Sequence, residues 1–260
     1  MRPLLLCALP LAACFAGDAD DRADTGDTGD TGDTGTPSRL PDAPEQVEVP
    51  AAEFTMGCDD CDPDEAPPHL VRLGAFRIDR WEVTNAWYEP CVTAYGCGEV
   101  PDNGAGPDGP VTGLTYEDAA DYCAWRGMAL PTEAQWEYAA RGEEARTYPW
   151  GDDEPDCEWA ASRACDGGLV AAGRHERGQG PFGAEDMAGN AWEWVSDWYD
   201  ADYYATSPAE DPTGGDAGGL RTVRGVDTWS DPAALRASNR EYAIPDARGP
   251  LVGLRCVDAS

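Results

Sequence analysis

Cysteine offers the most chemistry in this 260-residue chain, which has ten copies of it. Beyond Cys7 and Cys14 they are Cys58, Cys61, Cys91, Cys97, Cys123, Cys157, Cys165 and Cys256. Six of these lie close together in sequence, as Cys58 with Cys61, Cys91 with Cys97, and Cys157 with Cys165, but sequence alone does not settle the pairing. Cys58-Asp-Asp-Cys61 admits three interpretations: a redox dithiol, half of a zinc site without a second CxxC motif, or a structural disulfide. Flanking acids raise a thiol pKa and weaken a redox role, which favours the disulfide.

Histidine and aspartate side chains could provide a metal site or an acid–base pair. The chain has two histidines, His69 and His175, so a three-histidine iron centre within one chain is excluded. A site of two histidines and one carboxylate would have to join unrelated segments, so we interpret both as ordinary surface or hydrogen-bonded residues. Asp227 and Asp231 could act as an acid–base pair if a cleft separated their pKa values. Aspartate is abundant in this chain, however, so their proximity carries little information.

A metal ion is expected at residues 186–194, which read DMAGNAWEW. A hard cation prefers oxygen ligands, and a tight turn can supply several of them as backbone carbonyls. The alternative interpretation is a buried aromatic turn whose carboxylates cap amides.

The charge balance limits the partners of the chain. It has 50 acidic residues against 18 basic ones, all of them arginine, for a net charge of −32. Such a surface repels anionic polymers, so we expect no nucleic-acid partner. The 30 glycines and 22 prolines, with ten tryptophans, predict a loop-rich fold built around aromatic side chains.

Residues 1–13 have the features of a lipoprotein signal peptide. Arg2 precedes a short apolar stretch, and Leu-Ala-Ala-Cys14 reads as the lipobox of bacterial lipoproteins. The apolar run is too short to span a bilayer. We therefore predict lipidation of Cys14, a membrane anchor, and an extracytoplasmic place in the bacterial cell envelope, where the other cysteines can oxidise. The alternative is an ordinary secretion signal that leaves Cys14 free.

Two further segments complete the domain organisation. Residues 14–45 contain three Thr-Gly-Asp units and predict an acidic disordered tether. Residues 46–260 are predicted to form one domain, because no internal repeat or second linker follows. Within it we expect a strand at 76–79 and two helices, over residues 116–126 and 132–141, with Thr115 and Thr132 as their caps. Glycine- and aspartate-rich stretches predict mostly turns beyond residue 148.

Four groups of motifs in order carry a resemblance to a known family. They are FTMG at 54–57 with RWEVTN at 80–85, LPTEAQWEYAARG at 130–142, DMAGNAWEW at 186–194, and RG at 224–225 with GLRC at 253–256. Over residues 47–258 the chain resembles the formylglycine-generating (sulfatase-modifying factor) enzymes. The resemblance implies an α+β fold of the C-type-lectin kind, loop-rich and low in regular secondary structure.

The resemblance also implies a structural calcium ion and one long-range disulfide. The calcium ligands would be the side chains of Asp186 and Glu193 with the carbonyls of Gly189 and Ala191. The disulfide would join Cys123 to Cys256.

The family's oxidation chemistry does not carry over to this sequence. That reaction converts a substrate cysteine to formylglycine with copper and O₂, and it needs two enzyme cysteines after the Arg-Gly segment, because Cu(I) prefers thiolates. Between Asp166 and Arg255 the chain has no cysteine. We therefore expect no copper and assign no catalytic residue.

Three functions remain open. The first, which we favour, is a non-catalytic binding or structural module stabilised by calcium, with a peptide or envelope-protein ligand in a cleft lined by Asp227, Trp229, Arg240 and Trp192. The second is an oxidoreductase of the formylglycine-generating type, or another enzyme chemistry on the same scaffold. The third is a lectin-like sugar binder, although Glu154-Pro155-Asp156 matches the sugar-binding triplets of C-type lectins only in part.

Overall fold

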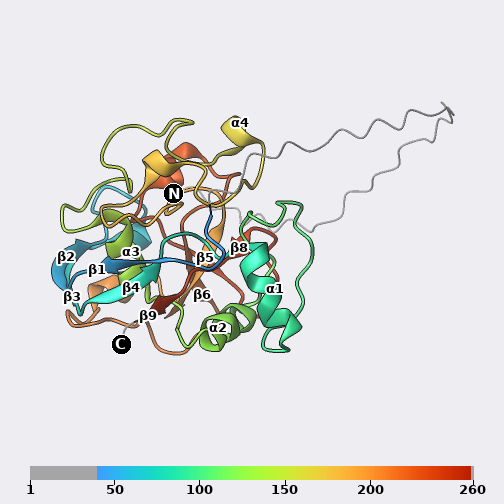
Figure 1. Cartoon of the computed structure of the whole chain (residues 1–260). Helices are drawn as coiled ribbons and strands as arrows, with labels where there is room; N and C mark the ends of the chain where they lie inside the picture. Colours follow the sequence, from blue (N-terminus) through green and yellow to red (C-terminus); the bar gives the residue numbers. More distant parts are fainter. Residues whose placement is uncertain (1–39, 259–260) are drawn as a thin grey trace, which may run out of the picture. The chain divides into compact units, whose positions relative to one another are not determined.

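The structure, a computed structural model, describes residues 40–258 (Figure 1). The predicted signal peptide, Cys14 and most of the predicted tether lie outside the described residues. The end of that tether contacts the domain: the Trp87 indole donates to the Pro41 carbonyl at 3.3 Å, and the Arg80 amide donates to the Glu45 carbonyl at 2.9 Å. Within residues 40–258, no helix is long and apolar enough to cross a bilayer.

Two small antiparallel sheets carry the N-terminal strands. β1 (Gln46–Val49) pairs with β4 (Phe76–Asp79), and β4 also pairs with β9 (Val257–Asp258), so the start and the end of the domain share one sheet. β2 (Ala52–Met56) and β3 (His69–Leu73) form a separate pair. The predicted strand at 76–79 is confirmed. Burial alternates along β2 and β3, as expected when only one face of a sheet meets the core.

A four-stranded sheet forms the centre of the domain. Its strand order is β7 (Glu241–Ala243), β6 (Arg221–Arg224), β5 (Trp192–Trp198) and β8 (Val252–Gly253), with β5 and β8 parallel. The sequence predicted mostly turns here and missed this sheet. The physical reason is that β5 is covered on both faces, with Trp194 in one hydrophobic cluster and Val195 in another, so it lacks the alternation that marks a half-exposed strand.

The two predicted helices are confirmed. α2 spans Tyr116–Trp125 and α3 spans Glu133–Arg141. The hydroxyls of Thr115 and Thr132 accept from the amides three residues later, at 3.1 Å in both cases, and satisfy donors that a helix start leaves free.

Two helices and four single turns were not predicted. α1 (Asn85–Thr93) contains Pro90, which normally breaks a helix, but Thr84 caps it through the Trp87 amide. α4 (Arg163–Asp166) is a single turn. Four 3₁₀ turns complete the description: η1 (Pro63–Glu65), η2 (Glu176–Gly178), η3 (Tyr203–Ala205) and η4 (Pro232–Leu235).

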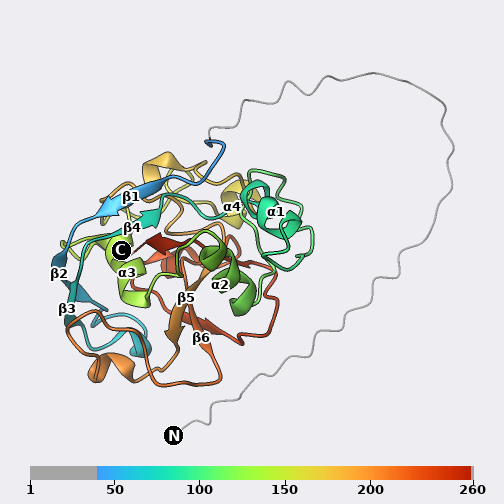
Figure 2. The ribbon, with the colours of Figure 1, turned by 60° about the horizontal axis from the view of Figure 1, so that its bottom comes forward.

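The helices lie on opposite sides of the central sheet. α1 and α2 lie together on one side of β5 and β6, where Tyr88 and Tyr122 join Trp194 in one cluster (Figures 1 and 2). α3 lies on the other side, where Trp136 joins Val195 and Phe54 in a second cluster. The fold is therefore α+β and loop-rich, as predicted.

Four disulfides join all eight cysteines of the described residues. They are Cys58–Cys61, Cys91–Cys97, Cys123–Cys256 and Cys157–Cys165. The Cys123–Cys256 bridge implied by the family resemblance is confirmed and ties α2 to the residue before β9. The six cysteines that lie close in sequence pair with their neighbours, and Cys58-Asp-Asp-Cys61 is a disulfide.

Candidate functional site

The loop that follows β6 places Asp227 between two tryptophans. Gly225 (φ 100°) and Val226 (φ 65°) turn the chain out of the strand. One Asp227 oxygen accepts from the Trp192 indole at 3.1 Å, and the other accepts from the Trp229 amide at 2.7 Å and the Ser230 hydroxyl at 3.0 Å. Both oxygens of this carboxylate are therefore used to shape the loop.

Asp231, the second member of the conceivable acid–base pair, also has a local structural role. Its carboxylate accepts from the Ala233 amide at 2.9 Å and caps η4. Each of the two aspartates thus holds a turn of its own loop, which leaves them poorly placed to exchange a proton with a bound molecule.

A pocket opens beside Trp229. It has a volume of about 410 Å³ and is lined by Asn103, Gly104, Ala105, Gly168, Leu169, Trp229, Pro250 and Leu251. The Trp229 side chain is about half exposed, and the Arg163 guanidinium lies 4.1 Å from the centre of its ring. This cation–π contact holds the ring in place. No side chain of the lining is titratable, and the Asn103 amide already donates to Pro110 and Thr112.

Arg240 does not share this surface. Its side chain is fully buried, donates to Glu133 at 2.7 and 3.0 Å, and donates to the Asp64 carbonyl at 2.6 Å. Of the four residues predicted to line one cleft, Trp229 alone lines the pocket described here; Asp227 and Trp192 are hydrogen-bonded to each other, and Arg240 lies in a buried ion-pair network.

That network links α3 to β6. Arg224 donates to Glu133 at 3.0 Å and to Glu137 at 2.8 Å, with all three side chains at 2% exposure or less. Arg141 adds a third guanidinium at 2.8 Å from Glu137. Buried charges are tolerated only when they are paired and hydrogen-bonded, so each member depends on the others.

One buried carboxylate beside the network has no arginine partner among residues 40–258. Asp197 accepts from the Glu133 amide at 2.8 Å and from the Ser196 hydroxyl at 3.1 Å. Burial, followed by the negative charge of Glu133, raises the pKa of Asp197 to about 7. This side chain therefore changes charge within the physiological pH range.

Three residues of the predicted calcium site, Asp186, Gly189 and Ala191, lie in the turn that leads into β5, and the fourth, Glu193, lies in β5 itself. Gly189 has φ 88°, and a Cβ there would lie 2.4 Å from the Ala161 carbonyl oxygen, so the position requires glycine. Asp186 accepts from the Gly173 amide at 2.5 Å. Glu193 is occupied on both oxygens: Arg255 donates to each at 2.7 Å, and the Trp136 indole adds a third bond at 2.7 Å.

Carboxylates outnumber guanidinium groups in this region. Glu82 is fully buried and accepts from Asn190 at 2.5 Å and from the Ala191 amide at 2.9 Å. Burial, and then the charges of Asp186 and Glu193, raise the pKa of Glu82 well above its usual range. Burial likewise raises the pKa of Asp186 to about 6. This excess of buried negative charge would attract a cation, but Arg255 already occupies Glu193, so a calcium ion would depend mainly on Asp186 and the carbonyls of the turn.

The two histidines occupy separate environments. His69 Nδ1 lies 3.2 Å from the Pro67 carbonyl oxygen, and its ring packs on Tyr204. His175 Nε2 lies 3.2 Å from an Asp166 oxygen. Each histidine has its own hydrogen-bond partner, in agreement with the interpretation from sequence.

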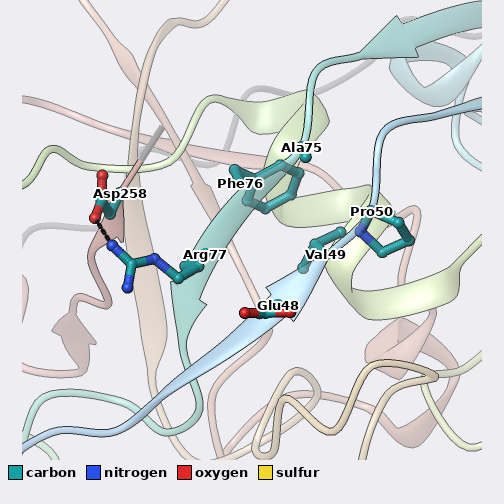
Figure 3. Close-up of a pocket in the computed structure, with 7 residues that line it drawn as sticks. All are labelled: Glu48, Val49, Pro50, Ala75, Phe76, Arg77 and Asp258. Carbon is teal, nitrogen blue, oxygen red and sulfur yellow. Dashed lines mark hydrogen bonds and ion pairs between the residues drawn. The ribbon is translucent and has the colours of Figure 1, made fainter. Parts of the chain in front are cut away.

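A second pocket lies at the end of the β1–β4 pair. It has a volume of about 390 Å³ and is lined by Glu48, Val49, Pro50, Ala75, Phe76, Arg77 and Asp258 (Figure 3). Arg77 pairs with Asp258 across its rim. None of the predicted site residues lines this pocket.

With the site described, its relationship to known proteins can be stated. Residues 32–260 match the family described as the sulfatase-modifying factor enzyme 1-like domain. The chain belongs to this family. A formylglycine-generating enzyme of Streptomyces coelicolor is 32% identical over 280 residues, covering 82% of this chain and 88% of that protein. A formylglycine-generating enzyme of Thermomonospora curvata is 31% identical over 291 residues, covering 85% and 96%.

The chain is also similar to proteins with other names. Serine/threonine-protein kinase pkn1 of Chlamydia pneumoniae is 32% identical over 244 residues, covering 85% of this chain but 39% of that protein. Among solved structures, PvdO from Pseudomonas aeruginosa is 29% identical with a TM-score of 0.73, covering 83% of this chain and 94% of that one. Treponema denticola variable protein 1 has a TM-score of 0.70 at 18% identity, covering 83% and 95%, and shows the shared fold.

Sequence reasoning missed two features of this family domain. Glu133 and Glu137 were visible in a motif, but their partner Arg224 lies 91 and 87 residues away, and no local signal indicates the pairing. Trp229 was predicted to line a cleft, but the three other segments that line the pocket beside it, residues 103–105, 168–169 and 250–251, were missed. In the sequence, the one indication of this pocket was the run of polar and aromatic residues after Arg224.

Proposed function

We propose that this sulfatase-modifying factor domain is a non-catalytic binding module and that its ligand enters the pocket beside Trp229. The observation that carries the proposal is the lining of that pocket, which has no titratable side chain. Asp227, two residues before Trp229, has both oxygens engaged, and Asp231, two residues after it, caps η4. General acid–base chemistry needs a group free to move a proton, whereas binding needs only shape and contact area.

The state of the cysteines supports the same proposal. Every cysteine among residues 40–258 is in a disulfide, and the loop from Arg224 to Asp231 contains none. A pair of thiolates for Cu(I) would first require reduction of one of those bonds. The relatives named as formylglycine-generating enzymes keep oxidation of a protein cysteine as the second candidate function.

The chemistry of the pocket favours an extended peptide as the ligand. Leu169, Leu251 and Trp229 offer an apolar wall for one hydrophobic side chain. The net charge of −32 attracts cationic partners and repels anionic ones, so basic residues should flank that side chain. A segment of an envelope protein meets both requirements.

Calcium and the lipid anchor complete the proposal. A calcium ion at Asp186 and the carbonyls of Gly189 and Ala191 would offset the buried carboxylates and stabilise the turn before β5. A lipid on Cys14 would hold the domain at the bacterial cell envelope. Labelling of the expressed protein with a fatty-acid analogue tests the anchor, and Cys14→Ser should abolish the label.

A peptide-binding experiment tests the main proposal. The calcium-loaded, oxidised protein is titrated with peptides that carry one aromatic or aliphatic side chain, with and without flanking arginines. Trp229→Ala should weaken binding at least about tenfold, as expected for an aromatic anchor. Tyr95→Ala is the matched control. It removes an almost fully exposed aromatic ring just after the end of α1, and the variant should bind the peptides normally.

The same protein distinguishes the second candidate. It is incubated with copper, O₂ and a sulfatase-type cysteine peptide beside an active relative, and the peptide is read by mass spectrometry. An unchanged peptide supports the binding module. Conversion to formylglycine would show that the domain is an oxidase and that the proposal is wrong.

A further inference from the structure

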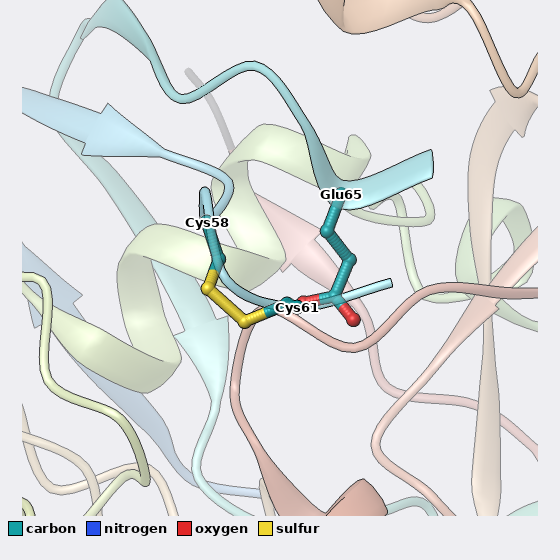
Figure 4. Close-up of side chains that lie close together, drawn as sticks. All are labelled: Cys58, Cys61 and Glu65. Carbon is teal, nitrogen blue, oxygen red and sulfur yellow. A yellow bond between two sulfur atoms is a disulfide. The ribbon is translucent and has the colours of Figure 1, made fainter. Parts of the chain in front are cut away.

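The Cys58–Cys61 disulfide lies against a buried carboxylate. Metal ions in proteins are held mainly by histidine, cysteine, aspartate and glutamate. Among the described residues, Cys58, Cys61 and Glu65 form the only group of three such side chains whose ligand atoms all lie within 4.8 Å of one another (Figure 4). Zinc binds thiolates at about 2.3 Å and carboxylate oxygens at about 2.0–2.2 Å, so one ion can reach ligand atoms with this spacing. The two cysteines are half-buried, which leaves the site accessible from solvent.

Glu65 offers one oxygen to this site. Its side chain is fully buried; Oε1 accepts from Arg236 at 2.6 Å, and Oε2 has no hydrogen-bond partner within residues 40–258. A buried carboxylate oxygen without a partner is costly, because it has lost its water without replacement. A cation held by the two sulfurs and this carboxylate would supply the missing partner.

The loop is anchored independently of the disulfide. The Cys58 amide donates to the Glu65 carbonyl at 2.9 Å, which closes the loop at its ends. The Gly57 amide donates to Glu137 at 2.8 Å, and Arg240 donates to the Asp64 carbonyl at 2.6 Å. These bonds to the buried ion-pair network should hold the three ligands together after the sulfur–sulfur bond is broken.

We propose that Cys58, Cys61 and Glu65 form a zinc site that exists only when the Cys58–Cys61 disulfide is reduced. A dithiol reductant transfers two electrons and two protons to the disulfide; the sulfur–sulfur bond breaks, two thiols form, and the reductant leaves as its own disulfide. Zn²⁺ then displaces both thiol protons and binds the two thiolates and Glu65 Oε2, which leaves a fourth position for water.

The surrounding charge favours a metal ion over thiol–disulfide exchange. Asp59 and Asp60 stand between the cysteines and are exposed, and Asp62 follows them. Negative neighbours disfavour a free thiolate, which is the species that exchange requires. A divalent cation reverses this effect, because it neutralises the thiolates and the carboxylates together.

Zinc titration of the full protein, with and without prior reduction by a phosphine, tests the proposal. The reduced protein should bind one more equivalent of Zn²⁺ than the oxidised protein, and Co²⁺ in its place should give a thiolate charge-transfer absorption. The double variant Cys58→Ser/Cys61→Ser should lose that equivalent. Glu65→Gln should weaken it at least about tenfold, since even groups that only support a metal ligand contribute this much.

Two further variants keep the outcome interpretable. Cys91→Ser/Cys97→Ser removes a different close pair and should retain the extra equivalent. If full reduction unfolds the protein, the titration is repeated on a variant without the 91–97 and 157–165 bridges. Only the 58–61 pair and the buried Cys123–Cys256 bond then remain to be reduced. Equal zinc binding by wild type and Cys58→Ser/Cys61→Ser, or by wild type and Glu65→Gln, would overturn the proposal.

Discussion

The carboxylate of Glu193 receives two hydrogen bonds of 2.7 Å from the guanidinium of Arg255, and both side chains are fully buried. Glu193 belongs to β5, and Arg255 lies between β8 and β9, 62 residues later. The Trp136 indole of α3 adds a third bond to the same carboxylate at 2.7 Å. This pair therefore joins the central sheet, the C-terminal segment and the helix that lies against them.

Removal of Arg255 should be severely destabilising. Arg255→Met leaves Glu193 as a buried charge without its counter-ion, which typically costs about 3–5 kcal/mol of the free energy of unfolding. Urea unfolding followed by fluorescence gives the difference from wild type. Arg77→Met is the matched control, because it breaks the Arg77–Asp258 pair at the surface, where the expected loss is about 0–1 kcal/mol. Equal losses in the two variants would contradict the importance assigned to burial.

Calcium should stabilise the protein through Asp186. An ion that binds only the folded state adds about 2.7 kcal/mol when its concentration is 100 times the Kd. The midpoint of thermal unfolding should therefore rise with added Ca²⁺ and fall with a chelator, and Asp186→Asn should remove this response. Asp197→Asn, which changes a buried acid on β5, should keep it. Superimposable melting curves of wild type with Ca²⁺ and with chelator would rule out the calcium site.

The parts of the fold that sequence predicted are those fixed by local interactions. Thr115 and Thr132 satisfy amides only three residues away, so their helices could be recognised from a short window. β5 could not, because tertiary contacts cover both of its faces.

The same distinction applies to the site. Asp227, Trp229 and Trp192 were predicted from motif position, and the Asp227 carboxylate brings them together. Arg240 was grouped with them on the same grounds, but its guanidinium turns toward Glu133, 107 residues away. Placing that side chain requires knowledge of where α3 packs, which no local pattern contains.

Stability should depend on pH through Asp197. Its folded pKa of about 7 lies above the unfolded value of about 3.9, so the native state binds the proton more tightly. The protonated Asp197 carboxyl therefore contributes to the free energy of unfolding. This contribution is on the order of 4 kcal/mol, is fully present below about pH 4, and is lost as the pH rises through about 7. Asp197→Asn cannot ionise and should show a smaller fall in unfolding free energy than wild type between these pH values. Parallel pH profiles for the two proteins would show that folding does not raise the pKa of Asp197.

The long-range disulfide should contribute more stability than a short one. A bridge lowers the conformational entropy of the unfolded chain, and this loss grows with the logarithm of the number of residues in the loop that it closes. Cys123 and Cys256 are 133 residues apart and Cys91 and Cys97 are 6 apart, for which the chain-entropy treatment gives about 5 and about 2 kcal/mol. The double serine variants of the two pairs, unfolded in urea without reductant, measure this difference. Cys123 and Cys256 are both fully buried, whereas only Cys91 of the other pair is, so serine leaves two buried hydroxyls in one variant and one in the other, and the gap between the variants should be at least as large as the entropy difference. A variant lacking the 123–256 bridge that is no less stable than the variant lacking the 91–97 bridge would mean that the unfolded chain is held compact by other contacts.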